Sequence, residues 1–519
     1  MTSVKKQKTE AILTKIYTDA YGENWREKLS VSLMYLPYGP DGLLYMEYDR
    51  KNKTVKKIKN KNKYLTIRDL NDSSVLFYAL KDCIITDKFE VTSFKFPREL
   101  TLIKISPEIN KLKGLINLEL RNYEEDVNVL NLASLKHLKS LKLVDYKFYD
   151  PDKVRIDRLK KLKNFSLINV NVSEKFVDNI WQLKNLEKLE GYNIKFTFSS
   201  GIGNLKNLQE LNIYKCETNY LPEEISKCTS LAIIIIADSF LRGTLPKNIG
   251  EMENLKYLRL SDNSLKGGIP SSIGKLKKLN NLDLKNNKLS GNIPDEIVKL
   301  ERLMNLDIEN NNLSRELPQD IGNLKKLVRL NLSKNNFSGS IPESICQTNL
   351  CYLLLSDNNL SGRIPTEIGN FNWLQHLDIS NNYLSGAIPE TFRYLYSLKK
   401  LNLSNNNFTG TIFDKMPDRG LYVKEDGYEY KFETEYDLSR KKETRNVITE
   451  IDISNNNFSG EILGFLYFSE SLRKLNLSGN HFSGAVPGYL DSLKFLDIYG
   501  NNFVESYPEE LDSIENFIK

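Results

Sequence analysis

The strongest constraint on the fold of this 519-residue chain is an internal repeat of the form LxxLxLxxN. The frame starts sixteen times, at steps of 21 to 24 residues, and one interruption separates two runs. The starts lie at Leu115, Leu138, Leu162, Leu186, Leu208, Leu231, Leu255, Leu279, Leu303, Leu327, Leu350, Leu374, Leu398, Ile448, Leu472 and Leu493. Because one copy cannot bury its own apolar side, successive copies must stack into a solenoid.

The positions within one repeat predict its local structure. In the segment LKYLRL, Leu258 and Leu260 alternate with polar or aromatic residues, which indicates a short strand with its leucines inward. Further along the repeat, Ile273, Leu276 and Leu279 recur every third residue, which favours a 3₁₀-like return segment. Each repeat is therefore expected to be one coil with a strand on one side and an irregular return on the other.

One asparagine recurs at the same position of the frame. Its amide is suited to bond backbone groups where each coil turns away from its strand, so the asparagines are expected to form a ladder. They are Asn263, Asn287, Asn311, Asn335, Asn358, Asn382, Asn406, Asn456, Asn480 and Asn501. Cys216 occupies this position in an earlier repeat.

Composition argues against several classes of partner. Hydrophobic residues make up 40% and charged residues 27%, as in folded soluble proteins, and 73 Lys and Arg nearly balance 67 Asp and Glu. This near balance gives no reason to expect nucleic acid as a partner. The cysteines are odd in number and form no CxxC pair, which predicts free thiols in a reducing compartment. They are Cys83, Cys216, Cys228, Cys346 and Cys351.

The N-terminal residues MTSVKKQKTEAILTKIY lack the apolar stretch of a signal peptide. The longest apolar run, from Leu231 to Ala237, is too short to span a bilayer. These two features predict a cytoplasmic protein, or an extracellular one if the true N-terminus is missing.

No constellation for catalysis or metal binding is visible. The three histidines, His137, His376 and His481, fall in separate repeats without ligand spacing. No nucleophile–histidine–acid set, convergent carboxylate pair or glycine-rich phosphate loop is apparent. We therefore expect no enzymatic activity, no metal and no cofactor.

The suffix LSGxIPxxIGxLxxL, clearest between Leu231 and Pro508, resembles the plant-type leucine-rich repeats of receptor-like kinases, receptor-like proteins and polygalacturonase-inhibiting proteins. The resemblance implies an α/β solenoid, a right-handed superhelix with a parallel β-sheet on its concave face. It also implies a second row of short strands near LxGxIP and a 3₁₀ or irregular convex side. No kinase segment follows the repeats.

The resemblance also suggests a domain order. Residues 1–100 are similar to a divergent N-terminal cap, a helix followed by a hairpin in LLYMEYDRKNKTVKKI. Leucine-rich repeats are expected over 101–413 and 447–508, a non-repeat island over 414–446, and a short closing cap over 509–519. In the receptor-like proteins such an island helps to bind a ligand or co-receptor, which makes Tyr428, Tyr430 and Tyr436 candidate ligand contacts.

A second candidate site lies on the expected concave face, where outward residues are usually polar. Aromatic and β-branched residues replace them at Tyr192, Tyr214, Ile233, Ile235 and Tyr257. Such a cluster is typical of a binding surface. The alternative is that these weaker early repeats pack differently and bury the cluster.

The favoured function is therefore a non-catalytic module that binds a protein or peptide on the concave face, in receptor-like recognition or signalling. Two alternatives remain: a secreted enzyme inhibitor of the polygalacturonase-inhibiting type, and an intracellular scaffold or regulatory subunit. We expect neither nucleic acid as a partner nor a membrane span in this chain.

Overall fold

The computed structural model describes residues 114–124, 132–412, 448–462, 471–504 and 506–519, with short segments and single residues elsewhere. The chain forms two compact units, unit 1 at Met1–Thr218 and unit 2 at Asn219–Lys519. Within the described residues, no helix has the length and apolar character needed to cross a membrane.

Unit 1 contains a sheet of parallel strands joined in order along the chain. They are β4 (Val91–Lys95), β5 (Asn117–Glu124), β6 (Ser140–Lys147), β7 (Asn164–Ile168), β8 (Lys188–Tyr192) and β9 (Glu210–Tyr214). The short β3 (Ile84–Ile85) pairs with β4 in the antiparallel sense. At the predicted hairpin, β1 (Tyr48–Asp49) and β2 (Thr54–Val55) also pair antiparallel.

One return segment of unit 1 is an α-helix, α4 (Glu174–Ile180), where the repeat predicted a 3₁₀ turn. The Ser173 hydroxyl caps it by accepting a hydrogen bond from the Phe176 amide at 3.1 Å. Phe176 and Ile180 are buried, so the helix presents an apolar face to the stack. The Ser173 cap and the four-residue spacing of the buried Phe176 and Ile180 together explain why α4 is an α-helix.

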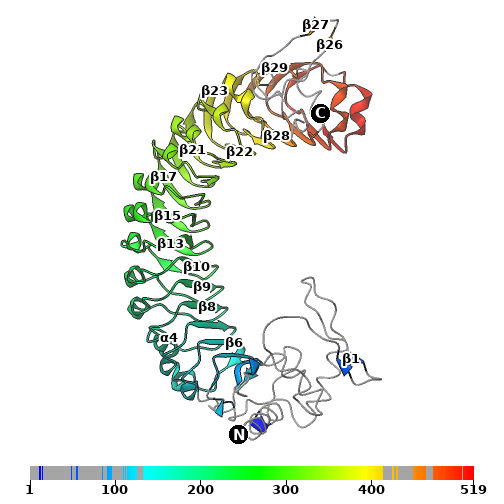
Figure 1. Ribbon diagram of the computed structural model, residues 1–519. Helices are drawn as coiled ribbons and strands as arrows, with labels where there is room; N and C mark the ends of the chain where they lie inside the picture. Colours follow the sequence, from blue (N-terminus) through cyan, green and yellow to red (C-terminus); the bar gives the residue numbers. More distant parts are fainter. Residues whose placement is uncertain are drawn as a thin grey trace. The chain divides into compact units, whose positions relative to one another are not determined.

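Unit 2 is built on a main sheet of parallel strands, one for each coil, which Figure 1 shows stacked in chain order. They are β10 (Ile233–Ala237), β12 (Tyr257–Arg259), β14 (Asn281–Asp283), β16 (Asn305–Asp307), β18 (Arg329–Asn331), β20 (Tyr352–Leu354), β22 (His376–Asp378), β24 (Lys400–Asn402), β28 (Glu450–Asp452), β30 (Lys474–Asn476), β32 (Phe495–Asp497) and β34 (Asn516–Ile518). From β12 to β32 the central residue of each strand is buried, as for Leu306, which is 1% exposed. The predicted parallel sheet is confirmed.

A second row of short strands follows the main ones, as the LxGxIP resemblance implied. It comprises β11 (Arg242–Gly243), β13 (Ser264–Gly267), β15 (Lys288–Gly291), β17 (Asn312–Arg315), β19 (Asn336–Gly339), β21 (Asn359–Gly362), β23 (Tyr383–Ala387), β25 (Asn407–Gly410), β29 (Asn457–Glu461), β31 (His481–Gly484) and β33 (Asn502–Phe503). These strands also run parallel. Each described coil of unit 2 from β11 to β33 therefore contributes to two sheets.

The return segments of unit 2 are 3₁₀ helices, as predicted. They are η9 (Glu223–Lys227), η10 (Ile249–Glu251), η11 (Ser271–Lys275), η12 (Asp295–Lys299), η13 (Ile321–Asn323), η14 (Glu343–Gln347), η15 (Ile368–Asn370), η16 (Glu390–Tyr394), η20 (Gly488–Ser492) and η21 (Glu509–Ser513). Ile273, Leu276 and Leu279 are fully buried between this side and the main sheet. In Figure 1 the main strands of unit 2 line its inner, concave side and the return segments its outer side.

The asparagine ladder is confirmed. The Asn311 amide donates to the carbonyls of Leu284 (3.1 Å), Ile308 (3.1 Å) and Glu309 (3.3 Å), and its Oδ1 accepts from the Leu289 amide at 3.0 Å. The same pattern recurs at Asn287, Asn335, Asn358, Asn382, Asn406, Asn456 and Asn480. Each ladder asparagine thus joins its own coil to the preceding one.

Two other residues take the ladder position where asparagine is absent. Cys216 donates its thiol to the Tyr214 carbonyl at 3.2 Å, and Ser239 donates its hydroxyl to the Ala237 carbonyl at 2.7 Å. Both side chains are fully buried. Small hydrogen-bonding side chains therefore replace the amide at these two positions.

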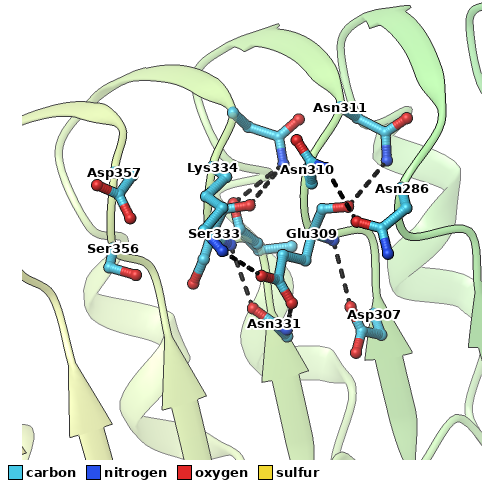
Figure 2. Close-up of polar contacts among 12 residues, drawn as sticks. Asn286, Asp307, Glu309, Asn310, Asn311, Asn331, Ser333, Lys334, Ser356 and Asp357 are labelled. Atoms are coloured by element: carbon cyan, nitrogen blue, oxygen red, sulfur yellow. Dashed lines mark hydrogen bonds and ion pairs between the residues drawn. The ribbon is translucent and has the colours of Figure 1, made fainter.

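A second, outer row of amides lies beside the ladder and is interrupted by Lys334 (Figure 2). Asn310 donates to Asn286 at 2.9 Å, whereas Lys334 instead donates to Glu309 Oε1 at 3.0 Å. Asn331 donates to the other oxygen of Glu309, also at 3.0 Å. Partial burial opposes ionisation of Glu309, but these two hydrogen bonds hold its pKa below the ordinary value of 4.5.

The last residues, where a closing cap was expected, form η21 and β34. The strand β34 pairs in parallel with β32, and Leu511 and Ile514 are buried beneath it. The segment therefore has the form of one more coil.

Candidate ligand-binding surface

The concave face of unit 2 carries two rows of outward side chains, because the first and third residues of each main strand flank a buried one. The leading row is Tyr257, Asn281, Asn305, Arg329, Tyr352, His376, Lys400, Glu450, Lys474 and Phe495. The trailing row is Arg259, Asp283, Asp307, Asn331, Leu354, Asp378, Asn402, Asp452, Asn476 and Asp497. In-register pairing places members of a row on adjacent strands side by side, about 4.8 Å apart.

The sector predicted from the sequence is divided between the two units. In unit 1, Tyr192 and Tyr214 are paired in register, and Tyr192 is 37% exposed. In unit 2, Ile233 pairs with Tyr257, and Ile235 lies two residues further along the same strand. These five side chains are all exposed or half-buried, so they are not core residues; their role as ligand contacts remains a prediction.

The island tyrosines cannot be placed as side chains. Tyr428 belongs to the short strand β27 (Tyr428–Glu429), which pairs antiparallel with β26 (Lys424–Glu425). Its side chain lies outside the described residues, as do Tyr430 and Tyr436 entirely. Their role in binding also remains a prediction.

An apolar patch that the sequence analysis missed interrupts the polar rows in the middle of unit 2. It consists of Met304, Val328, Cys351, Tyr352 and Leu354, and Met304 is 44% exposed. The Val328 amide donates to the Met304 carbonyl, and the Cys351 amide to the Val328 carbonyl, both at 2.8 Å. The first three residues are thus adjacent on successive coils, just ahead of the leading row.

A cation–aromatic cluster borders this patch. The Arg329 guanidinium lies 5.5 Å from the centre of the Tyr352 ring, which contacts the His376 ring edge-on at 4.8 Å. Arg329 also approaches Asp307 at 3.9 Å. Burial, together with the charges of nearby lysines such as Lys400, lowers the pKa of His376 below its ordinary value.

Next to this cluster the concave face is hollowed, with a volume of about 390 Å³. Its lining includes Leu354, His376, Asp378, Lys400, Glu450, Asp452, Lys474 and Phe495. Lys400 and Glu450 form an ion pair at 2.9 Å, so their charges compensate each other. The hollow therefore combines apolar walls with charged groups of both signs.

The thiols and histidines offer no reactive or metal-binding centre among the described residues. Burial raises the pKa of Cys216 to about 11 and that of Cys346 to about 12, so both stay protonated. Cys216, Cys228, Cys346 and Cys351 form no disulfide bond among the described residues. In the part of the chain that the structure describes, no three His, Cys, Asp or Glu side chains gather in a metal-binding arrangement.

Parallel strands one to a coil, an asparagine ladder and 3₁₀ returns define a leucine-rich-repeat solenoid of the plant type. In agreement, residues 241–341 match the model of a leucine-rich repeat region, and residues 349–371, 372–416 and 471–493 match leucine-rich repeat models. No curated protein matches the chain in sequence.

Solved structures share this fold. The plant peptide hormone receptor RGFR1 in complex with RGF2 is similar at 25% identity and a TM-score of 0.59, over 80% of this chain and 71% of that one. The ectodomain of the Arabidopsis receptor kinase HAESA matches at 24% identity and a TM-score of 0.62, over 83% and 74%. A leucine-rich-repeat protein of Leptospira interrogans matches at 26% identity and a TM-score of 0.59, over 78% and 95%.

Proposed function

We propose that this chain is a non-catalytic recognition module that binds a peptide or protein on the concave face of unit 2. The observation that carries the proposal is the apolar patch. Elsewhere the trailing row holds Asp or Asn on most strands, but at β20 it holds Leu354, next to the half-exposed Tyr352. A contiguous apolar surface rimmed by charged groups marks an interaction site more often than scattered apolar residues do.

The sheet geometry favours an extended polypeptide as the ligand. Neighbouring strands present outward side chains at a regular spacing of about 4.8 Å, and a buried leucine core fixes each strand. A rigid array of this kind loses little conformational entropy on binding. The similar RGFR1 structure is that of a peptide hormone receptor with RGF2 bound, which supports a peptide as the class of ligand here.

Three of the residues predicted from the sequence would extend the same site within unit 2. Ile233, Ile235 and Tyr257 lie on β10 and β12, on the same sheet of unit 2 as the apolar patch. Tyr192 and Tyr214 offer an aromatic surface on unit 1. The island tyrosines Tyr428, Tyr430 and Tyr436 are proposed as further contacts.

A pair of substitutions tests this function without disturbing the fold. The test variant combines Tyr352→Asn with Leu354→Asn on β20. Asparagine already occupies the same two rows on other strands, at Asn281, Asn305 and Asn402. The matched control is Lys299→Glu, at an exposed position of the return helix η12. We expect wild-type protein and the control to capture the same polypeptides from an extract of the source cells, as measured by quantitative mass spectrometry.

The double variant is expected to lose those polypeptides. If instead all three proteins capture the same set, the ligand does not contact the apolar patch and the proposal is wrong. Circular dichroism and a melting curve of the double variant serve as the control for folding. Locating a tagged copy in its own cells would decide between the cytoplasmic and extracellular alternatives, which remain predictions.

A further inference from the structure

The hollow contains a carboxylate, that of Asp378, in which only one of the two oxygens accepts hydrogen bonds from the described residues. Asp378 Oδ1 accepts hydrogen bonds from the Ser380 amide at 3.1 Å and the Ser380 hydroxyl at 2.6 Å. Asp378 Oδ2 has no hydrogen bond or ion pair to any residue that the structure describes. Asp378 belongs to the lining of the hollow, and it pairs in register with Leu354 of the apolar patch.

Three other carboxylates of the trailing row have a cation or a side-chain amide close to them. Arg259 pairs with Asp283 at 3.3 Å, and Arg329 approaches Asp307 at 3.9 Å. Asp452 Oδ2 accepts from the Asn476 amide at 3.3 Å. Asp378 lacks a comparable donor among the described residues, although it is half-buried.

The charge of Asp378 is not needed for the local fold. One strand further on, Asn402 Oδ1 accepts from the Ser404 amide at 3.1 Å and the Ser404 hydroxyl at 2.7 Å. The neutral amide thus makes the same two bonds as the carboxylate. Burial and the nearby charges of Asp357 and Asp452 raise the pKa of Asp378, so its ionised form has a cost in the free protein.

The cations of the hollow do not neutralise this end of it. Lys400 is paired with Glu450 at 2.9 Å. Lys474 lies on β30, three strands from β22, which corresponds to about 14 Å at the usual strand spacing. The Asp378 end of the hollow is therefore acidic, with an apolar wall beside it.

We propose that this end of the hollow binds a lysine or arginine side chain of a peptide ligand, while an apolar side chain of the same peptide packs on the apolar patch. The inference rests on the proposed function and adds the character of the ligand to it. Leu354 and Asp378 lie on adjacent strands, about 4.8 Å apart. An extended peptide advances about 3.3 Å per residue, so the apolar and basic residues stand one or two positions apart.

The test is a selection of random twelve-residue peptides displayed on phage, carried out on the full chain and on Asp378→Asn. The matched control is Asp283→Asn, which removes a carboxylate from the same row four strands away. We expect peptides selected on the wild type and on the control to be enriched in an apolar residue followed or preceded closely by Lys or Arg. On Asp378→Asn the basic residue should lose its enrichment.

Affinities of one selected peptide provide the quantitative check. Replacing its basic residue by norleucine is expected to weaken binding to the wild type at least about tenfold, as is usual when a hydrogen bond to a charged group is lost. Against Asp378→Asn the same replacement should change binding less than about twofold, because the partner charge is already gone. The norleucine measurement uses only the wild-type protein, so it tests the role of the basic residue even if Asp378→Asn misfolds.

Selected peptides without a basic preference would overturn the inference and leave peptide binding standing. A basic preference that survives in Asp378→Asn would overturn it as well. If no peptide is enriched on any of the proteins, the proposed function fails together with the inference.

Discussion

At the residue scale, Arg315 holds a backbone conformation that the equivalent positions of the second strand row give to glycine. Its φ is 76°, and φ is 84° at Gly291 and 76° at Gly339. A side chain in this left-handed region clashes with its own carbonyl, which costs about 1–2 kcal/mol. The coil containing Arg315 is therefore under local strain that its neighbours avoid.

We predict that Arg315→Gly stabilises the protein by about 1 kcal/mol, because glycine relieves that clash. Gly291→Ala is the matched opposite change, since a Cβ at Gly291 would meet no other atom within 4 Å and only the backbone is strained. It should destabilise by a similar amount. Urea denaturation measures both changes, and equal midpoints for Arg315→Gly and wild type would refute the strain.

Asp378→Asn is also expected to change how stability depends on pH. The folded protein raises the pKa of Asp378 above its ordinary value of 3.8, so folding favours the protonated form. The associated stability is present below pH 3.8 and is lost as the pH rises through the folded pKa. The variant, which has no charge to bury, should therefore melt higher than wild type at pH 7.

That advantage should shrink as the pH falls through the raised pKa of Asp378, and it should be gone below about pH 3.8. Melting curves of the two proteins between pH 3 and 7 measure the difference. A variant less stable than wild type at pH 7 would mean that the Asp378 charge has a structural role, contrary to the comparison with Asn402.

At the scale of the elements, stability depends on coils joined through the asparagine ladder. Asn311→Leu would leave the buried Leu289 amide without its partner. It would also remove one of the two side-chain amides that donate to each of the Leu284 and Ile308 carbonyls. An unsatisfied buried group costs about 1–3 kcal/mol and each lost hydrogen bond about 0.5–1.5 kcal/mol, so we predict a loss of about 3 kcal/mol or more.

Asn312→Ala, one residue further along at an exposed position, should change stability by less than about 0.5 kcal/mol. Chemical denaturation followed by circular dichroism compares the two variants. If Asn311→Leu is as stable as Asn312→Ala, the ladder does not hold the coils together.

The repeat period made the main strands, the 3₁₀ returns and the ladder predictable, because each role recurs at a fixed offset. Departures from the period were not predictable in the same way: α4 depends on the single cap at Ser173, and Ser239 makes its ladder bond through a hydroxyl. Part of the candidate site was also predictable, because side chains alternate along a strand and this alternation places residues such as Ile235 outward.

The apolar patch escaped the sequence analysis for a physical reason. Met304, Val328 and Cys351 are 23 or 24 residues apart in the chain and become neighbours only through the register of adjacent coils. An alignment of the repeats in columns would have revealed them, together with Leu354 in place of the usual Asp or Asn. Asp378 looked like repeat consensus, and its place beside Leu354 in the lining of the hollow is visible only in the structure.

At the scale of the whole molecule, the central claim is that unit 2 recognises a polypeptide with its concave face, around Tyr352. The most direct measurement is site-specific photo-crosslinking. A benzophenone-bearing phenylalanine replaces Tyr352 in one protein and the exposed Lys299 of the return helix η12 in another. Each is irradiated with the polypeptides that the wild type captures.

We expect a covalent ligand adduct from position 352, identified by mass spectrometry, and none from position 299. Adducts from position 299 with none from position 352 would contradict binding on the concave face, because the ligand would then lie on the return side of unit 2.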